Sequence, residues 1–157
     1  MFSAIVGVGF LAASMTAVLG NETVVLTAPC SQWAQMVSSP FGTREDPVTS
    51  GQEEFHKGLD IAVAEGTPVY AAAKGQVILA EESETGYGFH LQIKHEKGLE
   101  TLYAHCSQLE VEEGDWVKAG QEIAKSGATG EVTGAHLHFE VRENGKCVDP
   151  QWYLKGS

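Results

Sequence analysis

The sequence predicts an all-β domain built from many short strands. Eighteen glycines are spread through the 157 residues without a period, which indicates frequent tight turns. From residue 39 onward, short apolar runs alternate with glycine-containing turns, and no run keeps a helical spacing of apolar residues over a useful length. A chain of this length forms one domain with its own core and is too short for two domains of ordinary size.

The N-terminal segment, residues 1–20, is uncharged and mostly apolar. Its length suffices to cross a bilayer, although it lacks the basic start of a secretory signal. Three interpretations stay open: a membrane anchor or uncleaved signal, a cleaved signal, and an odd start within a longer reading frame or a buried segment. The first two place the remainder outside the cytoplasm, in the cell envelope or secreted. We expect residues 21–38 to form a connector and residues 39–157 to form the functional domain.

The expected strands follow one another along that domain. They are residues 69–73, 75–82, 90–96, 99–105, 115–127 and 136–143, each of which is a short run containing apolar residues. The glycine-containing segments between them are turns. Helical structure is expected at most as a single turn, near the connector or at residues 151–154.

A faint internal repeat relates two of these regions. Residues 65–78 (EGTPVYAAAKGQVI) match residues 113–123 (EGDWVKAGQEI) at E-G-x-x-V-x-A and again at G-Q-x-I. The repeat predicts two related hairpin units packed face to face, and its second half resembles the half-barrel units of biotinyl and lipoyl carrier domains. A carrier module, with Lys74 as the modified lysine, is therefore a rival hypothesis. Against it, such a module needs only about half this length and has no use for grouped histidines.

The net charge bears on possible binding partners, and the cysteine spacing bears on possible metal clusters and disulfides. Acidic residues outnumber basic ones by 21 to 10, and the formal net charge of −11 argues against nucleic acid as a partner. The three cysteines, Cys30, Cys106 and Cys147, show no C-x-x-C spacing that would suggest a metal cluster. We interpret them as small apolar residues, with a bridge between Cys106 and Cys147 left open.

Two histidines stand two residues apart in the stretch GAHLHFEV. Because side chains alternate along a strand, His136 and His138 point to the same face, with Cα atoms roughly 7 Å apart. The ordinary interpretation is the polar face of an amphipathic strand. The alternative is that both imidazoles face one cavity, which requires partners elsewhere in the chain.

The stretch FHKGLDIAV supplies such partners. On a straight strand His56 and Asp60 would be roughly 13 Å apart, too far to reach one ion. Gly58 and the β-branched residues just after Asp60 disfavour a helix, so we expect a bend at Gly58 that folds His56 back over Asp60. Together with one histidine of the HLH strand they would give three ligands and leave a fourth position for water, which is the arrangement of a catalytic zinc ion.

A fifth candidate residue lies in the stretch TLYAHCS. Period-2 alternation places Thr101, Tyr103 and His105 on one strand face. Three separate strands that each carry a histidine among small residues together favour a metal site. Tyr103 is interpreted as a packing residue, and His90 and His95 as ordinary surface positions.

These stretches resemble, in order, the signatures of the lysostaphin-type, LytM-like zinc endopeptidases of bacterial cell walls. The resemblance rests on PFGTREDP, FHKGLDIAVAEGTPVYAAAKGQV, TLYAHCS, VKAGQEIAKSGATGEVTGAHLHFEV and VDPQWYL, and it covers residues 39–154 without large gaps. It implies a compact antiparallel β-sandwich with a groove over a single zinc ion. It also implies that the substrates are peptide bonds in the stems or crossbridges of peptidoglycan.

The resemblance assigns a role to each of the five residues. His56, Asp60 and His138 are the implied zinc ligands, and His136 and His105 the implied catalytic pair. We expect His136 to act as the general base and His105 to orient water or stabilise the oxyanion, and the sequence permits these roles to be exchanged. Some relatives have lost ligands and act only as silent activators of other wall hydrolases, but this chain keeps all five positions.

Three other positions stay open at this stage. Arg44 either lines the groove or forms an ion pair with Glu45, Asp46 or another acid. Phe89 stands where the family often has a nearby asparagine, and could alter one groove wall. Cys106 replaces a more common leucine or methionine, which affects packing more than chemistry.

Overall fold

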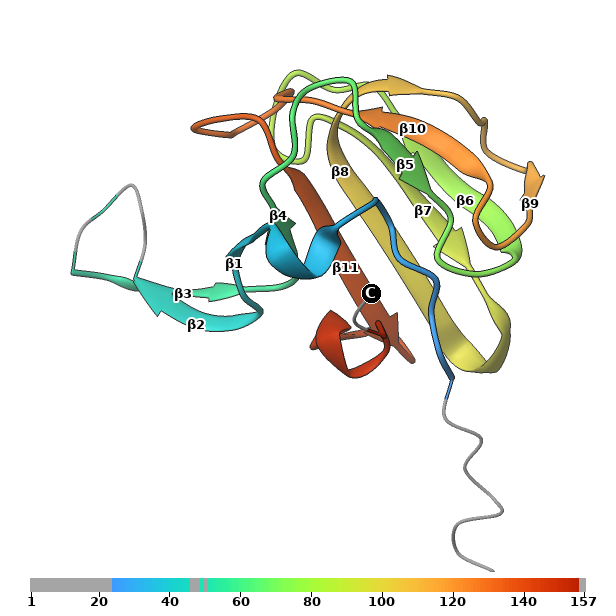
Figure 1. Cartoon of the computed structure of the whole chain (residues 1–157), viewed down its shortest axis with the longest axis horizontal. Coiled ribbons are helices and arrows are strands. Elements are labelled where there is room, and N and C mark those ends of the chain that lie inside the picture. The colour runs from blue at the N-terminus through green and yellow to red at the C-terminus, as the bar shows by residue number, and fades with distance from the viewer. Residues whose placement is uncertain (1–23, 46–48, 50, 156–157) are drawn as a thin grey trace, which may run out of the picture.

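The structure, a computed structural model, describes residues 24–45, 49 and 51–155. Within these residues it contains short strands and three single turns of 3-10 helix (Figure 1). The strands are β1 (Val37–Ser39), β2 (Gly42–Glu45), β3 (Glu53–His56), β4 (Leu59–Ile61), β5 (Pro68–Tyr70), β6 (Gly75–Glu81), β7 (Phe89–Lys94), β8 (Leu99–Leu109), β9 (Trp116–Val117), β10 (Glu122–Ser126), β11 (Leu137–Glu143) and β12 (Lys146–Val148). The helical turns are η1 (Trp33–Gln35), η2 (Glu96–Gly98) and η3 (Pro150–Trp152). The all-β prediction is confirmed. The expectation of at most one helical turn is wrong, because turns occur both in the connector and near residues 151–154, and η2 is a third.

The named strands pair antiparallel throughout. In the ten-stranded sheet, β1, β4, β11, β8, β7, β6 and β9 lie side by side in that order. β12 pairs with β11, while β10 pairs with β5 and with the C-terminal end of β8. β2 and β3 form a separate hairpin that projects from the body of the molecule beside β1 and β4 (Figure 1).

The hydrophobic core gathers apolar side chains from these strands. At its centre the rings of Tyr103 and Phe139, both fully buried, lie 5.3 Å apart. The Tyr103 hydroxyl accepts a hydrogen bond from the backbone N–H of Ala72 at 2.8 Å, which satisfies a polar group that would otherwise be costly to bury. The packing role predicted for Tyr103 is confirmed.

The predicted connector contributes to this core. Leu26, Cys30 and Trp33 are buried in the same hydrophobic cluster as the strands, and Leu26 forms a bridge with Leu154 near the C-terminus. The predicted apolar segment, residues 1–20, lies outside the described residues. In the part of the chain that the structure describes, no helix has the length and apolar character needed to span a bilayer.

The strands of the two halves of the internal repeat pair with each other. β5 and β6 come from the first repeat, and β9 and β10 from the second. β5 pairs with β10, and β6 pairs with β9, so each strand of one repeat lies beside a strand of the other. The related units thus pair with each other in place of forming two separate hairpins.

All three cysteines are free, so the bridge left open between Cys106 and Cys147 is not formed. Burial raises the pKa of the Cys30 thiol to about 11 and that of Cys106 to about 12. Buried thiols with such values stay protonated and unreactive at neutral pH, which agrees with a packing role.

The prediction of ordinary surface positions for His90 and His95 is wrong, since each is only 8% exposed. Their polar atoms have partners inside the fold. Nδ1 of His90 lies 2.8 Å from the carbonyl of Gly88, and Nδ1 of His95 lies 2.8 Å from the carbonyl of Lys74. A histidine beside a turn can therefore be buried at little cost when a backbone carbonyl lies within reach.

Candidate metal centre

The turn between β3 and β4 brings His56 and Asp60 together. His56 ends β3 and Asp60 is the middle residue of β4, so the chain reverses at Lys57 and Gly58 as the spacing predicted. Nε2 of His56 lies 3.1 Å from Oδ1 of Asp60. A Cβ atom at Gly58 would lie 2.5 Å from the carbonyl oxygen of Phe139, so only glycine lets this turn pack against β11.

Replacing Gly58 with alanine is expected to destabilise the fold by about 1–3 kcal/mol, because the added methyl group overpacks the turn against the backbone of β11. Urea denaturation followed by tryptophan fluorescence measures this change. Gly134→Ala is the matched control, because a Cβ atom there meets nothing within 4 Å and the backbone angle is not positive. Equal stability of the two variants would contradict the expected close packing.

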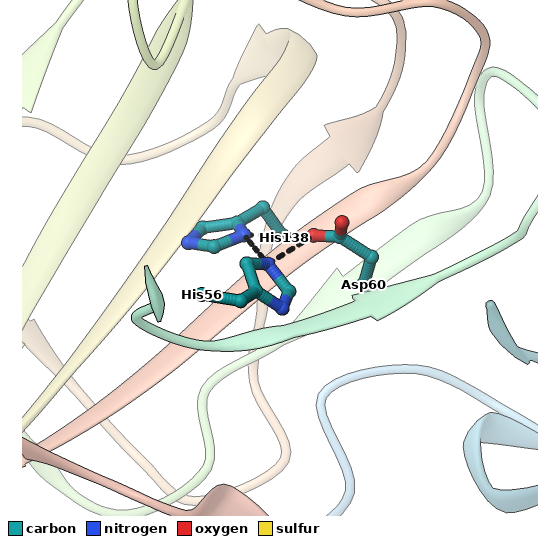
Figure 2. A group of neighbouring side chains, drawn as sticks. All are labelled: His56, Asp60 and His138. Atoms are coloured by element: carbon teal, nitrogen blue, oxygen red, sulfur yellow. Dashed lines mark hydrogen bonds and ion pairs between the residues drawn. The ribbon is translucent and has the colours of Figure 1, made fainter. Parts of the chain in front are cut away.

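The third side chain of the group comes from β11. His138 lies directly opposite Asp60 in the β4–β11 pairing. Its Nδ1 is 2.8 Å from Oδ1 of Asp60 and 3.2 Å from Nε2 of His56. Figure 2 shows the three side chains pointing toward one another, and all three are buried.

The separations between these atoms fit a zinc ion. Donor atoms bound at about 2.0–2.1 Å in a tetrahedral site lie about 3.3 Å from one another, close to the observed 2.8–3.2 Å. Two imidazoles and one carboxylate are also a donor set that zinc uses in catalytic sites. His56, Asp60 and His138 therefore can hold a metal ion.

In His56 and His138, the outer ring nitrogen, the one that points away from Asp60, has a hydrogen-bond partner that fixes the tautomer of the ring. Nδ1 of His56 lies 2.8 Å from the carbonyl of Pro40, and Nε2 of His138 lies 3.1 Å from the carboxylate of Glu140. Because these oxygens only accept hydrogen bonds, each outer nitrogen carries the proton. When these rings are neutral, the inner nitrogens carry lone pairs and three acceptor atoms converge. Such a group needs positive charge between its atoms, which either a proton on an imidazole or a bound metal ion supplies.

The charges around the centre also favour positive charge at this position. Burial alone would raise the pKa of Asp60, but hydrogen bonds from His138 and His56 hold that pKa well below its usual range. Burial alone would lower the pKa of His138, but its contacts with Asp60 and Glu140 raise it. Two ionised carboxylates thus flank the His138 ring and stabilise positive charge beside it.

Arg44 forms ion pairs with acids other than its sequence neighbours. Its Nη1 atom lies 3.3 Å from Oδ2 of Asp60 and 2.6 Å from the hydroxyl of Ser39, and its Nη2 atom lies 3.4 Å from Glu54. This contact occupies the outer oxygen of the aspartate and leaves Oδ1 for the centre. Ion pairing with another acid, one of the two alternatives for Arg44, is therefore what the structure contains.

His105 and His136 lie beside this group. Their ring centroids are 4.9 Å apart, and the His105 ring is 5.9 Å from that of His138. Nε2 of His136 lies 3.6 Å from Oδ1 of Asp60. The structure thus brings all five predicted residues to one place, and His136 and His138 face the same side as their spacing predicted.

The predicted strand face of His105 is wrong. Tyr103 lies opposite Phe139 on the core side, whereas the His105 ring meets the histidines on the other side. The alternation breaks because the β7–β8 register shifts by one residue here and His105 has a φ of 61°. A positive φ is unfavourable for histidine, and such residues concentrate at functional sites.

Both imidazoles are held through Nδ1 by backbone carbonyls. Nδ1 of His105 lies 2.9 Å from the carbonyl of Thr129, and Nδ1 of His136 lies 2.9 Å from that of Gly134. Each Nδ1 therefore carries the proton and each Nε2 is an acceptor. Burial lowers the pKa of His105 to about 4, so its ring is neutral at neutral pH.

Sequence reasoning missed two residues around the group. Glu140 contacts His138, and its position two residues after His138 on the same strand is a signal that could have identified it. Thr129 holds His105 from a loop, and no spacing pattern indicates that contact. Phe89, expected to alter a groove wall, is partly buried and packs against the hydrophobic core.

Comparison with known proteins finds similarity to peptidases. The model of peptidase family M23 matches residues 54–150. The DD-carboxypeptidase/endopeptidase Mpg of Neisseria meningitidis is 46% identical over 114 residues, which are 73% of this chain and 26% of that protein. The peptidoglycan DD-endopeptidase ShyB of Vibrio cholerae is 36% identical over 121 residues, which are 77% of this chain and 28% of that protein.

Solved structures share the fold. A zinc-containing peptidase from Vibrio cholerae aligns with a TM-score of 0.68 and 37% identity, covering 82% of this chain and 38% of that one. The catalytic domain of the antimicrobial peptidase lysostaphin from Staphylococcus simulans aligns with a TM-score of 0.67 and 32% identity, covering 79% of this chain and 96% of that one. The chain thus spans about a quarter of the length of the two curated relatives, and nearly all of the lysostaphin domain.

Proposed function

This chain belongs to peptidase family M23, and we propose that it is a zinc endopeptidase that hydrolyses peptide bonds in the stem peptides or crossbridges of bacterial peptidoglycan. The observation that carries the proposal is the convergence of three acceptor atoms of His56, Asp60 and His138 beside two more imidazoles. The peptidoglycan substrate is supported by the name of the Vibrio cholerae relative.

The metal has a defined chemical part. When bound by His56, Asp60 and His138, a zinc ion lowers the pKa of a water ligand to about 7 and polarises a carbonyl group. The chain itself contributes the dry, buried walls of the centre, since each of these three residues is less than 10% exposed. Low exposure strengthens every electrostatic interaction inside the site.

His136 is assigned as the general base. The bond from its Nδ1 atom to the carbonyl of Gly134 leaves Nε2 as the acceptor of the ring, and Nε2 faces the centre, where it can take a proton from the attacking water. The imidazolium that forms lies 3.6 Å from the Asp60 carboxylate, which stabilises its positive charge. The same proton then passes to the leaving amine as the carbon–nitrogen bond breaks.

His105 is assigned as the residue that orients the water. Its lowered pKa keeps the ring neutral, and its only ring N–H is already bonded to Thr129. A neutral imidazole without a free N–H accepts a hydrogen bond from water but cannot donate one to an oxyanion. Of the two parts expected for His105, orientation of the water is therefore the better supported.

Two other functions, a silent wall-binding module and a carrier module, fit the structure less well. A silent wall-binding module has no need for imidazoles held with Nε2 toward a metal centre, and both His105 and His136 are held in that way. A carrier module needs an accessible lysine, and Lys74 is mostly exposed, although it forms an ion pair with Glu96. Exposure of Lys74 alone therefore does not exclude the carrier. The match to an M23 peptidase across residues 54–150 argues against the carrier.

Digestion of purified sacculi tests the proposal. The zinc-loaded chain is expected to release soluble fragments, a chelator to stop the release, and added zinc to restore it. His136→Ala serves as the comparison because it should retain the metal and lose the release. A silent module would release nothing under any of these conditions, and a chain that bound no zinc would contradict the proposal outright.

Thr129 provides a finer test of the role of His105. Its hydroxyl donates to the carbonyl of Cys106 at 2.5 Å and accepts from the N–H of Phe89 at 2.9 Å, which fixes the carbonyl that holds His105. Thr129→Val keeps the shape and removes both bonds. We expect the rate of fragment release to fall about 10-fold, because small displacements of a catalytic group are costly. Thr129→Ser should restore the rate, and zinc content should be unchanged in both.

Localisation in the cell envelope follows from the proposed substrate. Peptidoglycan lies outside the cytoplasm, and the apolar residues 1–20 are suited to carry or anchor the domain there. The assignment of residues 39–157 as the peptidase domain belongs to the same proposal. Fractionation of cells that produce the full chain, with and without residues 1–20, tests this placement.

A further inference from the structure

Glu140 is a carboxylate that no water reaches. Its side chain is completely buried on β11, two residues from the proposed metal ligand His138. A buried carboxylate without partners costs several kcal/mol, so its surroundings must compensate for the lost hydration. In this fold they do so with polar groups from three directions.

The carboxylate receives hydrogen bonds at both of its oxygens. Oε1 accepts from the hydroxyl of Tyr87 at 2.5 Å and from Nε2 of His138 at 3.1 Å. Oε2 accepts from Nε and Nη2 of Arg142 at 2.9 and 2.7 Å, and from the thiol of Cys147 at 3.7 Å. Arg142 therefore holds Oε2 while Oε1 contacts His138. Glu140 cannot rotate away from His138 without losing both hydrogen bonds of its ion pair with Arg142.

This support has a consequence for the His138 ring. A ring nitrogen that donates to a fixed carboxylate keeps one tautomer and one orientation, and the ring becomes a stronger metal ligand. We propose that Glu140 is a positioning residue that, held by Tyr87 and Arg142, fixes the ring of His138 and thereby sets the metal affinity of the centre. The inference rests on the proposed zinc function and extends it to three residues that do not touch the metal.

The charges of the group agree with this role. Burial alone would raise the pKa of Glu140, but hydrogen bonds from His138, Tyr87 and Arg142 lower it to about 2. The same donors, Tyr87, His138 and Arg142, stabilise the ionised form of the carboxylate. Together with Asp60 it supplies two negative charges, which balance those of a divalent cation held between the imidazoles.

Two variants separate positioning from plain structural support. Glu140→Gln keeps the shape of the side chain and removes its charge, and Tyr87→Phe removes one donor that holds it. The same strand offers matched controls, because the hydroxyl of Tyr153 donates to Glu143 at 3.1 Å in an analogous tyrosine–glutamate pair. Glu143→Gln and Tyr153→Phe make equivalent changes away from the centre.

The test is zinc binding by the full chain in competition with a chromophoric chelator. Glu140→Gln is expected to weaken zinc binding about 10–100-fold, the usual cost of losing an outer partner of a ligating histidine. Tyr87→Phe should weaken it less but in the same direction, and both controls should match the wild type. In nitrogen-15 spectra, the His138 ring signals should shift in Glu140→Gln and stay at their wild-type positions in both controls.

The outcomes are distinguishable. Wild-type zinc affinity in Glu140→Gln, or unshifted His138 ring signals, overturns the positioning role and leaves the proposed function intact. If Glu140→Gln fails to fold, the comparison of Tyr87→Phe with Tyr153→Phe decides, and equal affinities overturn the role. A wild-type chain that binds no zinc overturns the proposed function together with this inference.

Discussion

Replacing His138 with alanine is expected to abolish zinc binding and hydrolysis together. The substitution removes one of the three converging ligand atoms and leaves the buried Glu140 carboxylate without its histidine partner. We expect zinc affinity to fall by more than the 10–100-fold that loss of an outer partner costs. Equilibrium dialysis of zinc and fragment release from sacculi measure the two effects.

A buried histidine outside the centre is the control for this prediction. His95 is as buried as His138, and its nitrogens contact Lys74 and Thr101 on another part of the fold. His95→Gln should bind one equivalent of zinc and release fragments at the wild-type rate. Retention of tightly bound zinc in His138→Ala would show that the metal is held elsewhere.

Removing either of the imidazoles proposed to be catalytic, His105 or His136, is expected to have a different effect, with zinc retained and activity lost. His136→Ala and His105→Ala should each lower the rate of fragment release by about 10²–10⁴, the usual contribution of a positioned acid–base group. The double variant should lose little more than the worse single variant, because groups that act as a unit are not additive.

This pattern distinguishes the two roles from metal binding. Neither His105 nor His136 holds its ring by a bond to a ligand side chain; the Nδ1 atoms are bonded to backbone carbonyls. Stoichiometric zinc in both variants is therefore expected. A variant that lost its zinc would have to be reassigned as a ligand, and one with full activity would be removed from the mechanism.

The candidate metal ligands His56, Asp60 and His138 were predictable because the sequence patterns that indicate them are local. A glycine between a histidine and an aspartate four residues apart leaves few backbone paths, and the bend at Gly58 is the path that the structure takes. The HLH spacing likewise fixes a shared strand face for His136 and His138. The relation between the two motifs depends on the β4–β11 pairing, which only the family resemblance indicated.

The predictions that failed depend on contacts between distant segments. The shift of His105 to the metal side depends on a bulge in β8, where its N–H is bonded to the carbonyl of Tyr87 and its ring to Thr129. Burial of His95 depends on a carbonyl from the segment before β6. Strand periodicity carries no information about such register shifts and remote carbonyls, so these features required the structure.

Mass analysis of crosslinked peptidoglycan fragments after digestion in oxygen-18 water tests the proposed function most directly. We expect the zinc-loaded chain to convert crosslinked fragments to smaller ones that carry a single new carboxyl group with one oxygen-18 atom, and His136→Ala to leave them unconverted. Stem peptides and crossbridges that both stay uncleaved by the zinc-loaded wild type, or cleavage confined to the glycan strands, would contradict the proposed function.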